Sequence, residues 1–162
     1  MVIFNRFRPI SLSKEVFARL KSNLKETILG IHISRAGGDV LYSFTIDKTI
    51  KIDLISQFIA ALSVFGEEMI GGIKQFILKG IKIDVVIYFK HQIILSVFYH
   101  SASRIKEADY ISKEAEIILD DFYETFKEQI QNGRNNQLIY EKFDKSMLYI
   151  IHSYFKRIEL MK

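Results

Sequence analysis

Four histidines are the first candidates for metal or acid–base chemistry: His32, His91, His100 and His152. No two of them stand three or four residues apart, the spacing at which a helix presents two metal ligands on one face. The chain has no cysteine, which excludes thiolate zinc sites and cysteine nucleophiles. The sequence therefore predicts no metal site. It predicts His91 in a solvated turn, with His32 and His152 as polar members of apolar elements.

Two acidic pairs, Glu67-Glu68 and Asp120-Asp121, are the candidates for paired-carboxylate catalysis. Both fall in segments with helical periodicity. Neighbouring side chains on a helix do not face each other, so the two carboxylates of a pair cannot flank one bond. The pattern predicts that both pairs lie on solvated helix faces.

A Gly-Gly-Asp sequence at residues 37–39 and several serines complete the candidate chemistry. The glycines lie between two apolar, β-branched runs and lack the spacing of a phosphate-binding loop, so they predict a tight hairpin. Ser34, Ser96 and Ser101 lack the context of a nucleophile elbow. These residues predict no catalytic site and no cofactor. Binding is the expected role.

The apolar periodicity predicts an α+β fold, an α/β/α sandwich. Links of two or three residues between the last three strands require antiparallel pairing. We expect a five-stranded antiparallel sheet with one central helix on one face and two C-terminal helices on the other. The expected elements are a helix after a cap at Ser11 or Ser13, strands at 28–34 and 40–46, a helix at 53–70 capped by Asp53, strands at 73–78, 81–89 and 93–99, and helices at 108–131 and 138–161.

A length of 162 residues fits one folded domain, which we place at residues 27–162, preceded by an amphipathic arm at residues 1–26. The longest apolar runs are shorter than the roughly 20 residues that cross a bilayer. The first residues lack the apolar core of a signal peptide. Together these features favour a cytoplasmic protein, with peripheral membrane contact as an extension.

The arm carries the whole net charge of +4, because the remaining residues are balanced. This distribution argues against a general nucleic-acid-binding face. Two interpretations of the arm stay open: an anionic membrane or partner surface, or packing of Leu12, Val16, Phe17 and Leu20 onto the domain. The residues of the first interpretation are Arg6, Arg8, Lys14, Phe17, Arg19 and Lys21.

The central helix is apolar over a wider arc than one sheet face requires, because Ile55, Ile59 and Val64 flank a stripe that begins at Leu54. Together with the following strand, which lies at a sheet edge in the arrangement implied by the family resemblance given below, it forms a candidate dimer or partner interface. The alternative is that the helix is core and that Lys74 and Lys79 protect the edge. The candidate interface residues are Ile55, Phe58, Ile59, Leu62, Phe65, Met69, Ile73, Gln75 and Ile77.

Three segments carry a resemblance to the roadblock/longin superfamily, which has a profilin-like fold: ILGIHISRAGGDVLYS at 28–43, FIAALSVFGEE at 58–68 and IKQFILKG at 73–80. The two C-terminal helices look longin-like, and the helix before the first strand looks roadblock-like. The Lys- and Ile-rich composition would suit an archaeal member or another AT-rich genome. The resemblance implies a non-enzymatic platform that dimerises, binds small Ras-like GTPases in trafficking or signalling complexes, and regulates nucleotide exchange or hydrolysis.

The leading functional hypothesis is therefore a scaffold or regulator that binds a small GTPase, or a second roadblock/longin domain, as a homodimer or heterodimer. The alternative is a peripheral membrane or vesicle-coat-like adaptor that uses the arm. A small-molecule sensor, with its ligand between sheet and helix, ranks third because similar layered folds serve that role and fold does not fix function.

Overall fold

A computed structural model describes residues 13–103, 105–106 and 109–158. It contains one five-stranded antiparallel sheet in the order β2-β1-β5-β4-β3. The elements are α1 (Lys14–Thr27), β1 (Ile28–Arg35), β2 (Val40–Thr45), α2 (Ile52–Ile70), β3 (Gln75–Leu78), β4 (Ile83–Lys90), β5 (Ile93–His100), η2 (Ser101–Ser103), α3 (Ser112–Gln131), α4 (Gln137–Tyr140), η4 (Glu141–Phe143) and α5 (Asp144–Arg157).

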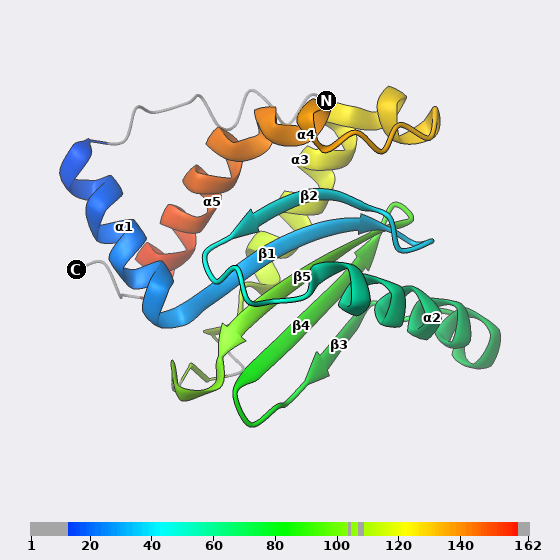
Figure 1. Cartoon of the computed structure of the whole chain (residues 1–162), viewed down its shortest axis with the longest axis horizontal. Helices are drawn as coiled ribbons and strands as arrows, with labels where there is room; N and C mark the ends of the chain where they lie inside the picture. Colours follow the sequence, from blue (N-terminus) through cyan, green and yellow to red (C-terminus); the bar gives the residue numbers. More distant parts are fainter. Residues whose placement is uncertain (1–12, 104, 107–108, 159–162) are drawn as a thin grey trace.

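Helices cover both faces of the sheet, as Figure 1 shows: α2 lies in front of the strands, and α3 and α5 lie behind them. This arrangement confirms the predicted fold class. The larger core lies between the sheet and the C-terminal helices, where Phe122 packs against Phe126 and Phe143 with ring centroids 4.9 and 5.1 Å apart. The smaller core lies beneath α2 around Ile59, Ile87 and Phe98.

The N-terminal helix joins the larger core through Leu20 and Leu24, which are almost completely buried. Ser13 is its cap, since its hydroxyl accepts a hydrogen bond from the Val16 amide at 3.3 Å. The helix runs into β1 without a loop. The packing interpretation therefore holds for Leu20, whereas Leu12 lies outside the described residues.

Both tight hairpins form where the sequence predicts turns. In the first, Gly38 alone of the glycine pair has a positive φ, 101°. In the second, His91 and Gln92 both have φ near +60°, the backbone of a two-residue turn that matches strand twist. Register is therefore set locally on both sides of the sheet.

Several predicted boundaries are wrong. Lys51, not Asp53, occupies the cap position of α2, and its side chain makes no capping hydrogen bond. The fourth strand begins at Ile83 instead of Ile81, because a tight turn brings the Ile83 carbonyl against Gly80 and leaves Ile81 fully exposed. The helix predicted from residue 108 begins at Ser112.

The last predicted helix, residues 138–161, is interrupted. A tightened 3-10 turn at Glu141–Phe143 separates α4 from α5. Tyr140 directly precedes the turn and Phe143 is its last residue, and the rings of both contact Phe122. Periodicity alone did not reveal this turn, because the buried residues on either side keep a helical spacing.

None of the described helices is both long enough and apolar enough to cross a membrane.

Candidate partner interface

Helix α2 turns a stripe of large apolar side chains away from its own sheet. Leu54 is 62% exposed, Phe58 55%, Phe65 59% and Met69 65%. These positions are separated by four, seven and four residues, so they lie on one side of the helix. We call these four residues the outer stripe. The helix also extends beyond the outline of the strands in Figure 1.

The opposite side of α2 is narrow and built from small residues. Ser56, Ala60 and Gly66 accompany Ile59 toward the sheet. A Cβ atom at Gly66 would overlap the Ile73 side chain, so glycine is needed for this close approach. Ile59 is fully buried among these small residues, whereas the outer stripe stays exposed.

The structure separates the predicted interface residues into three groups. Phe58, Phe65 and Met69 belong to the outer stripe, and Ile55 and Leu62 are half-buried. Ile59 is fully buried against the sheet and is not accessible to a partner. Leu54, Val64 and Ile70 are exposed apolar residues that the prediction omitted. For Leu54 the signal was present, because its spacing from Phe58 places both residues on one stripe.

Strand β3 is an edge of the sheet, as predicted, because it pairs only with β4. Gln75 is exposed, and Ile73 is half-buried against Gly66 of α2. Ile77 packs toward the larger core, on the face away from α2. The residues that share the α2 face are instead Phe76 and Leu78, which are half-buried. Alternation along a strand could have identified them once the edge was known.

One of the two predicted edge lysines is held in place by other residues. Lys79 Nζ donates to the Tyr110 hydroxyl at 2.6 Å and lies 3.5 Å from an Asp84 carboxylate oxygen. These contacts direct it toward the start of α3. Lys74 remains exposed beside the strand. The outer stripe and the edge strand β3 are thus the two candidate surfaces for protein contact, and Glu67, Glu68 and Lys74 are exposed on or beside them.

The basic residues of the arm are exposed where the structure describes them: Lys14, Arg19 and Lys21. Phe17 is 44% exposed on the same helix. Arg6 and Arg8 lie outside the described residues. The helix therefore buries one side in the core and keeps its cations in solvent.

His32 is buried in β1 on the α2 side of the sheet, as a polar member of an apolar strand. Its Nδ1 lies 3.0 Å from the Ser43 hydroxyl, and its Nε2 has no hydrogen-bond partner. Burial lowers its pKa to about 4, because the charged imidazolium would lose its hydration. The ring is neutral at physiological pH.

The Asp120-Asp121 pair departs from the prediction of a solvated face. Asp120 binds Lys90 at 2.9 Å and His91 at 2.6 Å, and His91 also stacks on Tyr123. Asp121 is buried, one of its oxygens has no partner, and burial raises its pKa to about 6. The two carboxylates therefore have different surroundings: Asp120 is paired with cations, and Asp121 is buried. Glu67 and Glu68 are exposed, as predicted.

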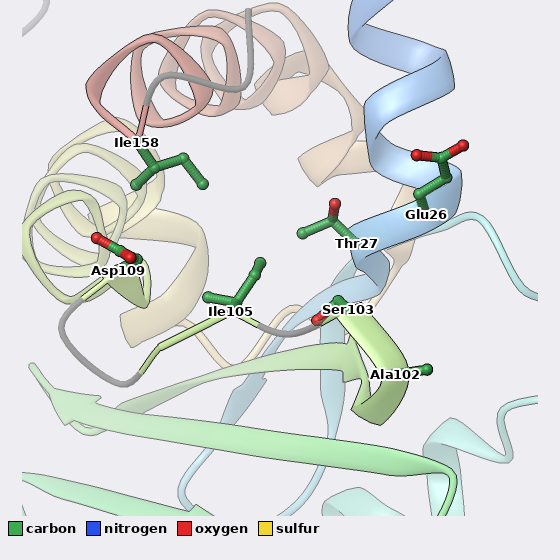
Figure 2. Close-up of a pocket in the computed structure, with 7 residues that line it drawn as sticks. All are labelled: Glu26, Thr27, Ala102, Ser103, Ile105, Asp109 and Ile158. Atoms are coloured by element: carbon green, nitrogen blue, oxygen red, sulfur yellow. The ribbon is translucent and has the colours of Figure 1, made fainter.

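A polar pocket of about 360 Å³ lies where the ends of α1 and α5 meet the loop after η2 (Figure 2). Glu26 and Asp109 supply its carboxylates, and Thr27 and Ser103 its hydroxyls. The sensor hypothesis places a ligand between sheet and helix, whereas this pocket lies at helix ends. Among the described residues, no group of three or more histidine, aspartate or glutamate side chains could hold a metal ion.

Comparison with known proteins identifies the fold. No family model matches the sequence, and no curated protein is similar to it in sequence. Among solved structures, MglB from Myxococcus xanthus matches with a TM-score of 0.52 at 13% identity, over 72% of this chain and 98% of that one. The gliding protein MglB of Thermus thermophilus gives 0.43 at 13% identity, over 55% and 73%. A Roadblock/LC7 domain from Streptomyces avermitilis gives 0.41 at 10% identity, over 52% and 77%.

The match covers nearly the whole of the Myxococcus xanthus MglB chain. At this level of identity the likeness concerns the fold. The protein has a roadblock/longin-type fold.

Proposed function

We propose that this protein is a non-enzymatic binding platform that regulates a small Ras-like GTPase and works as a homodimer or heterodimer in a signalling or trafficking complex. The observation that carries the proposal is the outer stripe of α2, where four large apolar residues are each more than half exposed. Soluble monomers rarely leave such a contiguous apolar surface uncovered. The resemblance of the sequence to the roadblock/longin superfamily supplies the GTPase as the partner class.

The dimer part of the proposal rests on two adjoining features. The outer stripe supplies apolar area, and β3 supplies an unpaired strand edge on the same side of the molecule. An edge strand can extend its sheet with a strand from another chain, while helices beside it bury their side chains. We expect the second chain to be another copy or another roadblock/longin domain.

Light scattering on the purified protein tests the dimer. We expect a dimer at micromolar concentration, and Phe65→Asp should shift it to monomer, because a carboxylate would be buried in an apolar contact. Leu138→Asp is the matched control, since Leu138 is 67% exposed on α4, away from the outer stripe. A wild-type monomer at high micromolar concentration would refute self-association.

Purified small Ras-like GTPases, each loaded with GDP or a GTP analogue, test the partner. We expect a complex that depends on the nucleotide state, together with a changed rate of fluorescent nucleotide release or of GTP hydrolysis. Failure to bind any such GTPase in either state would sink the GTPase proposal while leaving the dimer result intact.

The second candidate, a peripheral membrane or vesicle-coat-like adaptor, is favoured by the exposed cations of α1. Each lysine or arginine near an anionic membrane contributes about 1 kcal/mol of attraction. Deleting residues 1–26 is an unsuitable test because it would remove the core residues Leu20 and Leu24. Reversing the charges of Lys14, Arg19 and Lys21 keeps the core. Unchanged flotation with phosphatidylserine vesicles would exclude this role for α1.

A further inference from the structure

An apolar groove of about 410 Å³ runs between α1, the end of β2 and α5. Leu20 and Leu24 are its buried side chains, and Phe17 stands at its rim with 44% of its surface exposed. The far wall contains Phe44 and Ile46, both half-buried, and the other lining residues are Lys21, Thr45 and Leu148. We call this feature the α1–β2 groove.

One wall of the groove is the second edge of the sheet. Among the described residues, β2 pairs with β1 alone, so its outer edge has backbone groups that no neighbouring strand uses. Such an edge accepts an extended peptide by adding a strand, while side-chain pockets beside it select apolar residues. The groove thus combines the two features that hold an extended apolar segment.

We propose that the α1–β2 groove is the docking site of the segment that precedes α1 in the same chain, residues 1–12. The described structure begins at Ser13, whose carbonyl accepts the Phe17 amide at 2.9 Å, so the preceding segment starts one helical turn from the rim. Twelve extended residues reach about 40 Å, whereas the 14 residues of α1 span about 21 Å. The segment is long enough to fold back along the whole groove.

The composition of the segment fits this site. Its sequence MVIFNRFRPISL is rich in large apolar residues and contains no acidic residue. Pro9 disfavours helical backbone at Arg8, which suits an extended ligand. Lys21 lines the groove, and Asp47 directly follows Ile46 of the far wall. Because these two charges are opposite, the apolar content of a segment decides whether it binds.

Attachment to the same chain favours this occupant over any other. A short flexible connection holds a segment at an effective concentration in the millimolar range, so weak apolar contacts are sufficient for docking. This inference depends neither on a GTPase partner nor on dimerisation through α2.

Paramagnetic relaxation in the full chain tests the proposal. Because the chain has no cysteine, Asn5→Cys provides a single site for a nitroxide label. We expect the amide signals of Lys21, Phe44 and Thr45 to lose intensity in the oxidised sample relative to the reduced one. Introducing Phe17→Asp should restore these signals, whereas Phe65→Asp, an equally polar change at an exposed phenylalanine of α2, should leave the loss in place.

Three results would overturn the inference. The first is that the groove amides lose no signal, that the loss is uniform or centred on another surface, or that the loss at the groove persists in Phe17→Asp. The second is a loss of the groove signals when nitroxide-labelled protein is mixed with an isotope-enriched copy that carries no nitroxide. This result would assign the groove to a second chain. The third is perturbation of the groove amides only after phosphatidylcholine–phosphatidylserine vesicles are added, because this assigns it to lipid.

Discussion

Arg35, at the end of β1, is bonded to Asn135, which lies 100 residues later in the loop before α4: Arg35 Nε donates to Asn135 Oδ1 at 2.8 Å. The same guanidinium donates to the carbonyls of Ile130 and Arg134, where α3 ends. Asn135 in turn donates to Asp39 in the first hairpin at 3.3 Å. One side chain therefore ties the β1–β2 hairpin to the end of α3 and to the loop that follows it.

Arg35→Lys should destabilise the protein by about 1–3 kcal/mol, because a compact ammonium cannot reproduce the widely spaced donors that the planar guanidinium directs to its three acceptors. Urea denaturation followed by circular dichroism measures the loss. Arg19→Lys is the control, since Arg19 is exposed on α1. Equal stability of the two variants would show that the Arg35 contacts contribute nothing to the free energy of unfolding.

Asp121→Asn should stabilise the protein at neutral pH. Burial raises the folded-state pKa of Asp121 to about 6 from an ordinary value of 3.8. A raised carboxyl pKa favours folding below pH 3.8, and this contribution is lost as pH rises through 6. The amide removes a buried charge, with a gain of about 1–3 kcal/mol at pH 7.

The gain from Asp121→Asn should shrink as the pH falls toward 4, which denaturant titrations at pH 7, 5 and 4 would measure. Asp120→Asn is the matched neighbour and should not stabilise, because it removes the partner of Lys90 and His91. A gain that is independent of pH would contradict the explanation from buried charge.

His32 gives the opposite dependence on pH. Its folded-state pKa is lowered from 6.5 to about 4, so its contribution to stability is present above pH 6.5 and is lost as pH falls through 4. His32→Gln should flatten the slope of unfolding free energy between pH 6.5 and 4, by up to about 3 kcal/mol over that range. His100→Gln, at an exposed position, should retain the wild-type slope. An unchanged slope in His32→Gln would assign the acid sensitivity to other groups.

Local sequence patterns were sufficient to predict the hairpins and the antiparallel pairing of the last three strands. Both depend on short links and on periodicity within one segment, as at the His91-Gln92 turn. The edge position of β3 was implied by the family resemblance. The orientation of α2 was not predictable in this way, because apolar residues occupy both of its sides. Gly66 leaves room for the Ile73 side chain and Ala60 is buried, and both features appear only in the folded chain.

The burial of Asp121 and the bond between Arg35 and Asn135 were also beyond local patterns. Both depend on segments that come together only in the folded chain, and an acidic pair in a helix is usually solvated. For the candidate interface, the sequence predicted exposed apolar residues on α2, and the structure shows them there beside an edge strand. It did not distinguish the buried Ile59 from the exposed Phe58, or place Phe76 on the α2 face and Ile77 on the other.

The ion pair between Glu114 and Arg157 joins the start of α3 to the end of α5. Arg157 Nε and Nη2 donate to the two Glu114 oxygens at 2.7 and 2.9 Å, and Nη2 also reaches the Tyr110 carbonyl at 3.1 Å. Glu114 is buried and its partner is partly exposed. Glu114→Gln should cost about 3 kcal/mol, because it weakens a bidentate pair and leaves the guanidinium without its counter-ion.

A double-mutant cycle separates the pair from its surroundings. The variant Glu114→Met with Arg157→Met should lose less stability than the sum of the single variants, because no unpaired charge remains between the helices. Urea denaturation of all four proteins measures the coupling. Additive losses would mean that the two residues act independently, and that the contact of Arg157 with Tyr110 accounts for its share.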